Sequence, residues 1–185
     1  SGDLRSHKKY KYALEEFPND YIITLDDDLY YDENVLKNLV ELKKEFPECV
    51  PTNRAHKLKF DNSSILSYGK WLHNDFSIIA SNHLVQTGGF GTLYTFDDLY
   101  KDFNNEQLFL KLAPFADDLW LKIMVLLADK KIVTNEKYNK DPLVVKGTQS
   151  NKLVTANIID GGNDTQLNNL IDYYKLTKKD FDDAI

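Results

Sequence analysis

The sequence predicts a single α/β domain over residues 1–185, in which a sheet and helices pack in layers. Three observations predict it. The chain has 185 residues, of which 42% are hydrophobic, enough for one domain with its own core and too few for two full domains. Short β-branched runs alternate with apolar stripes at helical spacing. Aromatic residues make up 12% of the chain, a content at odds with disorder.

The first part of the chain predicts two helices around a strand. Residues 8–17 and 33–46 carry apolar side chains at helical spacing, and a proline ends each segment. Asp32 is expected to cap the second helix. Residues 21–25 are short, apolar and β-branched, which predicts a buried strand. A further strand is expected at residues 50–55.

The second part of the chain is less regular. Residues 57–75 are polar and aromatic without clear periodicity, so we expect a long loop there. Residues 118–128 are apolar nearly all round, which predicts a buried helix, and a last helix is expected at residues 165–174. Short strands are expected at residues 76–80, 132–134 and 143–146.

Composition excludes several classes of protein. The net charge is -6 and no segment resembles a basic arm, so no nucleic-acid partner is expected. A single cysteine, Cys49, excludes an intramolecular disulfide and a cysteine-rich zinc site, and it fits a reducing compartment. No apolar run reaches the roughly 18 residues that span a membrane, so no transmembrane segment is expected. Lys8, Lys9 and Lys11 form a cluster that we interpret as a solvated helix face.

Three consecutive aspartates, Asp26, Asp27 and Asp28, directly follow the predicted strand at residues 21–25. Ligands of open α/β sheets bind beyond the carboxyl ends of strands. If the backbone stays extended, Asp26 and Asp28 point the same way and Asp27 points away. Two carboxylates on one side suit Mg²⁺ or Mn²⁺ together with substrate phosphates. The alternative, which local chemistry favours equally, is a solvated acidic turn before the next helix.

A second acidic pair, Asp117 and Asp118, opens the apolar helix expected at residues 118–128. In isolation such a pair is more often a helix cap that complements the helix dipole. The functional alternative is a catalytic base that accepts a proton from a substrate hydroxyl. The neighbouring Trp120 has two interpretations as well, the lining of a sugar pocket or a core residue.

Glycines at positions 88, 89 and 91 mark a turn before residues 92–96. The spacing is not a dinucleotide-binding fingerprint. Glycines permit positive φ and a close approach between the backbone and a ligand, although a plain tight turn explains them equally well. The histidines are scattered with no metal-binding spacing, so each is interpreted as structural or exposed, and His83 has the better prospect of a role because it lies near this turn.

In this order, the segments resemble glycosyltransferases of the GT-A fold, and in particular the family 2-like bacterial enzymes that build surface polysaccharides. The resemblance covers about residues 8 to 174. It rests on four stretches of sequence: YIITLDDDLYYDENVLKNL, GGFGTLY, FLKLAPFADDLWLKIM and GGNDTQLNNLI.

The resemblance implies a Rossmann-like mixed sheet flanked by helices, and an inverting transfer of a sugar to a saccharide or lipid-linked saccharide acceptor. The donor is a nucleotide-sugar, with UDP the common nucleotide. Asp26 and Asp28, as the outer acids of a DXD motif, would hold Mn²⁺ or Mg²⁺ and the diphosphate. Asp118 would be the base, beside Asp117 where many relatives have Glu. Asp27 would contribute to donor or acceptor binding.

The resemblance further implies that Gly88, Gly89 and Gly91 lie near the donor sugar and the acceptor. The sugar-pocket interpretation of Trp120 would place it at the acceptor as well. It places the protein in the cytoplasm, at the inner face of the membrane. The family's first β-α-β unit, which holds the nucleobase, should precede residue 8, so a fragment without that unit is expected.

Two other functions compete with the transferase. A non-catalytic carbohydrate- or protein-binding module on the same fold would explain the missing unit and the many Tyr and Phe residues. A metal-dependent phosphohydrolase is disfavoured, because the sequence shows neither a nucleophile motif nor a histidine-rich metal cluster.

Overall fold

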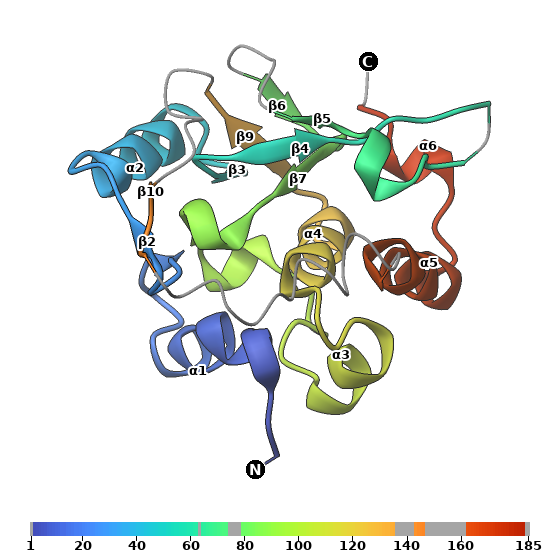
Figure 1. Cartoon of the computed structure of the whole chain (residues 1–185), viewed down its shortest axis with the longest axis horizontal. Coiled ribbons are helices and arrows are strands. Elements are labelled where there is room, and N and C mark those ends of the chain that lie inside the picture. Colours follow the sequence, from blue (N-terminus) through green and yellow to red (C-terminus); the bar gives the residue numbers. More distant parts are fainter. Residues whose placement is uncertain (1, 63, 74–78, 136–142, 147–161, 184–185) are drawn as a thin grey trace.

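The protein is a mixed α/β domain of small sheets and helices (Figure 1), seen in a computed structural model. The structure describes residues 2–62, 64–73, 79–135, 143–146 and 162–183. The α/β class predicted from the sequence is therefore confirmed. No helix in these ranges is long and apolar enough to cross a membrane.

Two small three-stranded sheets carry most of the pairing. In the first, β9 (Lys131–Thr134) lies in the centre, parallel to β3 (Cys49–Pro51) and antiparallel to β6 (Ile79–Ser81). In the second, β4 (Ala55–Lys57) lies between β5 (Leu72–His73) and β7 (Leu84–Gln86), antiparallel to both. Strands this short derive their stability from the packing of the domain.

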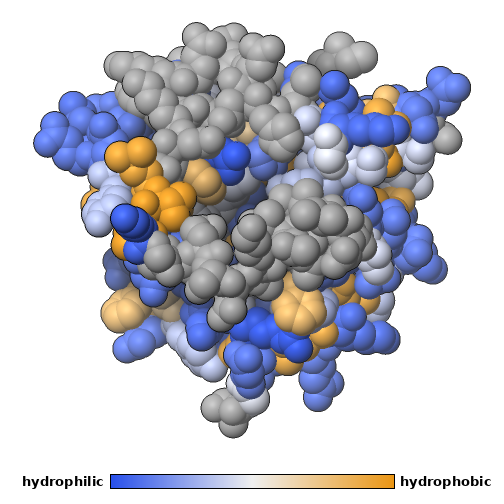
Figure 2. Space-filling view, in the orientation of Figure 1, coloured by the Kyte–Doolittle hydropathy of each residue, from blue (hydrophilic) through white to orange (hydrophobic). Residues whose placement is uncertain are grey.

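Two further strand pairs complete the sheet structure. β1 (Ile22–Thr24) runs antiparallel to β8 (Thr92–Tyr94), and Thr24 lies opposite Thr92. Thr92 also bridges to Thr52, just after β3, and the two hydroxyl oxygens lie 2.8 Å apart. β2 (Leu29–Tyr30) pairs with β10 (Leu143–Val144). Figure 2 shows apolar side chains gathered over this last pair, where Leu143 is 75% exposed.

Helices lie below the strands and at both sides of them in Figure 1, and α4 (Asp117–Leu127) lies at the centre of the packing. It contacts β7, β9 and α5 (Gly162–Tyr174), and its Trp120, Ile123 and Met124 are fully buried. The remaining described helices are α1 (Lys8–Glu16), α2 (Val35–Glu45), α3 (Glu106–Leu112) and α6 (Lys178–Phe181). Single 3-10 turns are η1 (Arg5–His7), η2 (Tyr68–Lys70), η3 (Gly88–Phe90) and η4 (Phe96–Asp98).

The strand predicted at residues 50–55 is wrong in one respect, because the structure splits it into β3 and β4. The break follows from the pairing: the Thr52 N–H donates to Val133 O, whereas the Asn53 N–H donates to Gly91 O. The chain thus leaves β9 and crosses to a different partner within two residues. The long loop expected at residues 57–75 is also wrong, since it contains η2 and β5.

The cap predicted for α2 is corrected as well. The helix begins at Val35 with Asn34 as its N-cap. Asp32 lies two residues before this N-cap, and its carboxylate accepts a hydrogen bond of 2.8 Å from the Asn34 backbone N–H rather than from a helical residue. Of the strand expected at residues 76–80, the first three residues lie outside the described residues, and the rest belong to β6.

Candidate functional site

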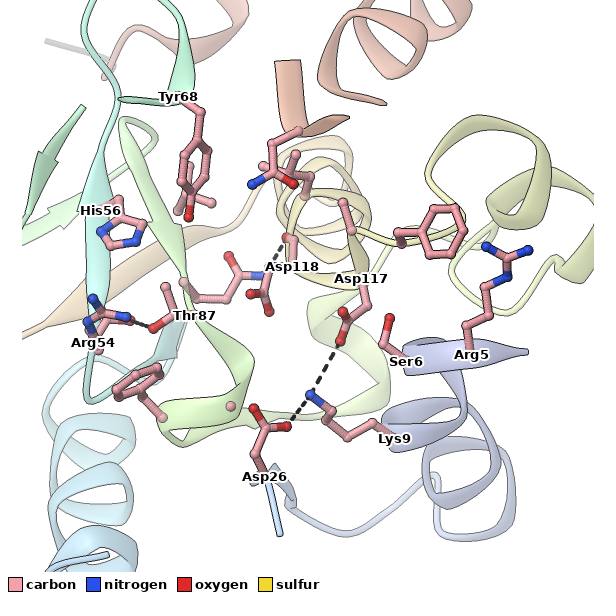
Figure 3. Close-up of a pocket in the computed structure, with 18 of the residues that line it drawn as sticks. Arg5, Ser6, Lys9, Asp26, Arg54, His56, Tyr68, Thr87, Asp117 and Asp118 are labelled. Atoms are coloured by element: carbon pink, nitrogen blue, oxygen red, sulfur yellow. Dashed lines mark hydrogen bonds and ion pairs between the residues drawn. The ribbon is translucent and has the colours of Figure 1, made fainter. Parts of the chain in front are cut away.

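A cavity of about 780 Å³ opens where α1, the loop after β1, η3 and the start of α4 meet. Figure 3 shows Lys9, Asp26, Asp117 and Asp118 turned toward one another in its centre. Arg54, His56 and Tyr68 line one side and Arg5 lines the other. The volume lies within the range of about 300–1,000 Å³ that is typical of small-molecule sites.

Asp118 is held in place by the turn that follows β7. Its Oδ1 accepts a hydrogen bond of 2.7 Å from the Gly88 backbone N–H. A Cβ on Gly88 would lie 2.8 Å from that oxygen, closer than real Cβ atoms come. Glycine at position 88 therefore permits the close approach of the carboxylate to the backbone.

Asp26 is placed by the same turn from the opposite side. Its carboxylate packs directly on Gly89, where a Cβ would come within 1.9 Å of Oδ2. The Tyr31 hydroxyl links the backbone at Asp26 to the backbone at Gly89. It accepts a hydrogen bond of 2.7 Å from the Asp26 N–H and donates one to Gly89 O. The glycine turn therefore fixes both Asp26 and Asp118 against one short stretch of backbone.

Lys9 of α1 reaches into this group of acids. Its Nζ lies 2.5 Å from Asp26 Oδ1 and 3.8 Å from Asp117 Oδ2 (Figure 3). Burial opposes the charge of Lys9, but the attraction of Asp117, Asp118 and Asp26 outweighs it and raises the pKa of the ammonium. The centre of the cavity thus holds a permanent positive charge among three carboxyl groups.

Asp118 has the environment of a proton acceptor that works near neutral pH. Loss of water around it and repulsion from Asp117 raise its pKa to about 7, although Lys9 and the Gly88 N–H lower it in part. A carboxyl group with a pKa close to the working pH combines a usable fraction of the ionised form with sufficient basicity. Perturbed carboxyl groups in a cleft are typical of functional sites.

The side walls combine aromatic rings with cations. The Arg54 guanidinium lies 4.1 Å from the centre of the Phe90 ring, and the Arg5 guanidinium lies 3.8 Å from that of Phe115. Tyr68 is held by its backbone N–H, which donates 2.7 Å to the Asp164 carboxylate at the start of α5. Aromatic faces with polar groups beside them are typical of walls that bind sugars and planar ligands.

The structure brings together some of the residues predicted for the site. The cavity is lined by Asp26, Asp117, Asp118 and Gly89. The Gly88 backbone N–H donates a hydrogen bond to the Asp118 carboxylate. The helix cap expected as the alternative for the acidic pair is wrong, because Ala116 is the N-cap and no side chain caps the helix end. Asp117 and Asp118 do lie in the first turn of α4, where their charge complements the helix dipole.

The other predicted residues lie elsewhere. The chain turns at Asp27 and Asp28, so the alternation expected of an extended backbone is lost, and neither is among the described residues that line the cavity. Gly91 has φ +99, a backbone conformation of the turn that favours glycine. Trp120 is a core residue whose indole N–H donates 3.0 Å to Phe103 O, so the core interpretation is correct for it.

The residues present do not fit a divalent ion held by Asp26 and Asp28. The two carboxylates do not share the cavity, and Lys9 neutralises Asp26. Nor do the described residues contain a group of three His, Cys, Asp or Glu side chains placed to hold a metal. The predicted Mn²⁺ or Mg²⁺ therefore stays a prediction from the sequence.

Sequence reasoning missed the cationic half of the site. Lys9 is not part of a solvated helix face, because it belongs to the cavity centre, while its neighbour Lys11 is buried beside Glu15. His56, rather than His83, is the described histidine that lines the cavity. No local signal marks either residue, since their role depends on segments that are distant in sequence.

Comparisons of the chain with protein-family models, with curated proteins and with solved structures find no match.

Proposed function

We propose that the chain transfers a glycosyl group from a nucleotide-sugar, with UDP as the expected nucleotide, to a hydroxyl of a saccharide or lipid-linked saccharide acceptor. The observation that carries the proposal is Asp118, a carboxylate fixed by a backbone N–H inside a sugar-sized cavity, with a pKa raised to about 7. The order of the sequence motifs, which resembles that of GT-A-fold enzymes, supports the same reaction.

In this reaction Asp118 accepts the proton of the acceptor hydroxyl. The acceptor oxygen bonds to the anomeric carbon of the donor as the bond from that carbon to the diphosphate oxygen breaks. The electron pair of the broken bond leaves with the nucleoside diphosphate. Attack from the face opposite the leaving group inverts the anomeric configuration. Asp117 raises the basicity of Asp118 by repulsion, while aromatic side chains such as Tyr68 and Phe90 offer faces for the sugar rings.

The experiment measures UDP release from several UDP-sugars in the presence of a panel of oligosaccharides. Asp118→Asn keeps the shape of the side chain and an oxygen that can accept from Gly88 N–H, so the fold and UDP binding should persist. Transfer should fall by about 10²–10⁴-fold, the usual contribution of a general base. Asp20→Asn, an exposed acid, is the matched control and should behave as the wild type.

The same aromatic walls also favour a second candidate, a non-catalytic saccharide-binding module. The experiment separates the two. Oligosaccharide binding without UDP binding or UDP release would establish the binding module. UDP release that Asp118→Asn leaves unchanged would show that the proposed base is wrong.

A further inference from the structure

Lys9 occupies the position beside Asp26 that the sequence resemblance assigns to a metal ion. Lys9 is the second residue of α1, and its side chain is 24% exposed. Its Nζ donates 2.5 Å to Asp26 Oδ1, on the side of that carboxylate away from its contact with Gly89. A second cation at Asp26 would have to displace this ammonium or accept its repulsion.

The ammonium also keeps donors for a ligand. An ammonium carries three N–H donors. Among the described residues, the Lys9 ammonium donates one hydrogen bond, to Asp26. The Asp117 carboxylate lies 3.8 Å away, which is an ion-pair distance and too long for a hydrogen bond. Two N–H donors therefore remain at the wall of the cavity. Charge-assisted hydrogen bonds of this kind are strong ligands for phosphate oxygens.

Basic side chains in the cavity wall match the acids in number. Among the described residues, four acidic and four basic side chains line the cavity. Arg5, Lys8 and Lys9 come from the N-terminal segment. Figure 3 shows Arg54 across the cavity from Arg5 and Lys9. A diphosphate in the cavity would thus meet cations from two sides. A metal ion would not be required to offset the charge of Asp26, Asp117 and Asp118.

We infer that Lys9 is the resident cation of this site: its ammonium binds the diphosphate of the donor in place of a divalent metal ion. The inference rests on the proposed function and names the group that receives the leaving diphosphate. The alternative is that Lys9 forms only a structural ion pair between α1 and the loop after β1. In the first case, removal of the Lys9 charge weakens the binding of a diphosphate. In the second case, it leaves that binding unchanged.

The test is calorimetry with UDP and with inorganic pyrophosphate, first in EDTA and then with excess Mn²⁺. Wild-type protein should bind both ligands in EDTA. Lys9→Met, which keeps the length of the side chain and removes its charge, should weaken binding in EDTA at least tenfold. Added Mn²⁺ should restore part of this loss, because Asp26 and Asp117 are then unpaired and can accept the ion. Lys9→Arg should retain binding in EDTA.

The control is Lys44→Met, which removes an exposed lysine of α2 and should bind as the wild type. Thermal melting checks that each variant is folded. Wild-type binding that needs Mn²⁺ would overturn the inference and leave the proposed function standing. Binding by folded Lys9→Met at wild-type strength in EDTA would overturn it as well. No binding of UDP by wild-type protein under either condition would remove the proposed function together with the inference.

If Lys9→Met does not fold, the metal dependence of the wild type and of Lys9→Arg decides the question. Metal-independent binding by both supports the resident cation. A strict requirement for Mn²⁺ in either protein overturns it.

Discussion

Asp118 sets the pH at which the proposed transfer operates. Only its ionised form accepts a proton, and its pKa is raised to about 7. The value of kcat/KM should therefore rise about tenfold per pH unit below pH 7 and level off above it. A pH profile of UDP release measures this. In Asp118→Asn the residual rate should lose this dependence, and an identical profile in that variant would assign the titration to another group.

The same residue links catalysis to stability. The pKa of Asp118 in the folded protein lies above its ordinary value of 3.8, so the folded state binds more protons between about pH 4 and 7. The free energy of unfolding therefore falls as pH rises through this range, and the loss is complete above pH 7. Asp118→Asn should be more stable than the wild type at pH 8, by about 1 kcal/mol, and not at pH 4. Urea unfolding at the two pH values tests the sign.

Gly89 offers a test of the site that removes none of its charged residues. A Cβ at this position would come within 1.9 Å of Asp26 Oδ2, so Gly89→Ala should push the Asp26 carboxylate out of position. We expect a loss of at least tenfold in UDP binding, and a cost of about 1–3 kcal/mol in stability. Gly69→Ala is the control, because a Cβ there would have no neighbour within 4 Å. Equal binding by the two variants would contradict the placement of Asp26.

Among the elements, α2 is fastened to η4 by a buried ion pair. Lys43 Nζ donates 2.9 and 3.0 Å to the two oxygens of Asp98, and both side chains are at most 7% exposed. Removing one partner leaves a buried charge unpaired, so Asp98→Ala should cost about 3–5 kcal/mol in urea unfolding. The exposed pair of Lys37 and Glu41 on the same helix is the control, and Glu41→Ala should cost less than about 0.5 kcal/mol. A similar small cost for both would show that the buried pair contributes little.

The elements that could be predicted from sequence are those whose signal is local. α1, α4 and α5 are confirmed to within a few residues, because apolar spacing over two or more turns is a strong pattern. The three-residue strand β7 and the seven-residue helix α3 escaped prediction, since neither is long enough to show a period. The pairing partners of the short strands likewise depend on the whole chain.

In the site too, residues with a local sequence signal could be predicted, and residues placed by the whole fold could not. The sequence predicts Asp26, Asp117 and Asp118 as candidates, because acids after a strand or at a helix start are visible locally. It does not predict that Lys9 lies among them. Lys9 and Asp26 are 17 positions apart in the sequence, and Asp26 and Asp117 are 91 positions apart, so only the folded chain brings them together. Convergence of distant segments is a property of tertiary structure, and it places the Lys9 ammonium against the Asp26 carboxylate.

Stability of the whole domain should reflect one more buried charge, Lys122 of α4. The residue is 1% exposed, and among the described residues its Nζ has no hydrogen-bond partner. Burial lowers its pKa to about 7, against an ordinary value of 10.5, and Asp183 offsets this only in part. Between about pH 7 and 10 the unfolded chain therefore binds the extra proton, and the free energy of unfolding should rise with pH.

Asp118 and Lys122 act in adjoining pH ranges and with opposite signs, so their combined effect places a minimum of stability near pH 7. Lys122→Met fills the same volume without a charge. It should raise the free energy of unfolding at pH 7 by about 1–3 kcal/mol, and the increase should shrink by pH 9, where the wild-type lysine is already neutral. Urea unfolding at both pH values measures it. Lower stability of Lys122→Met at both would mean that the ammonium has a stabilising partner in the folded domain.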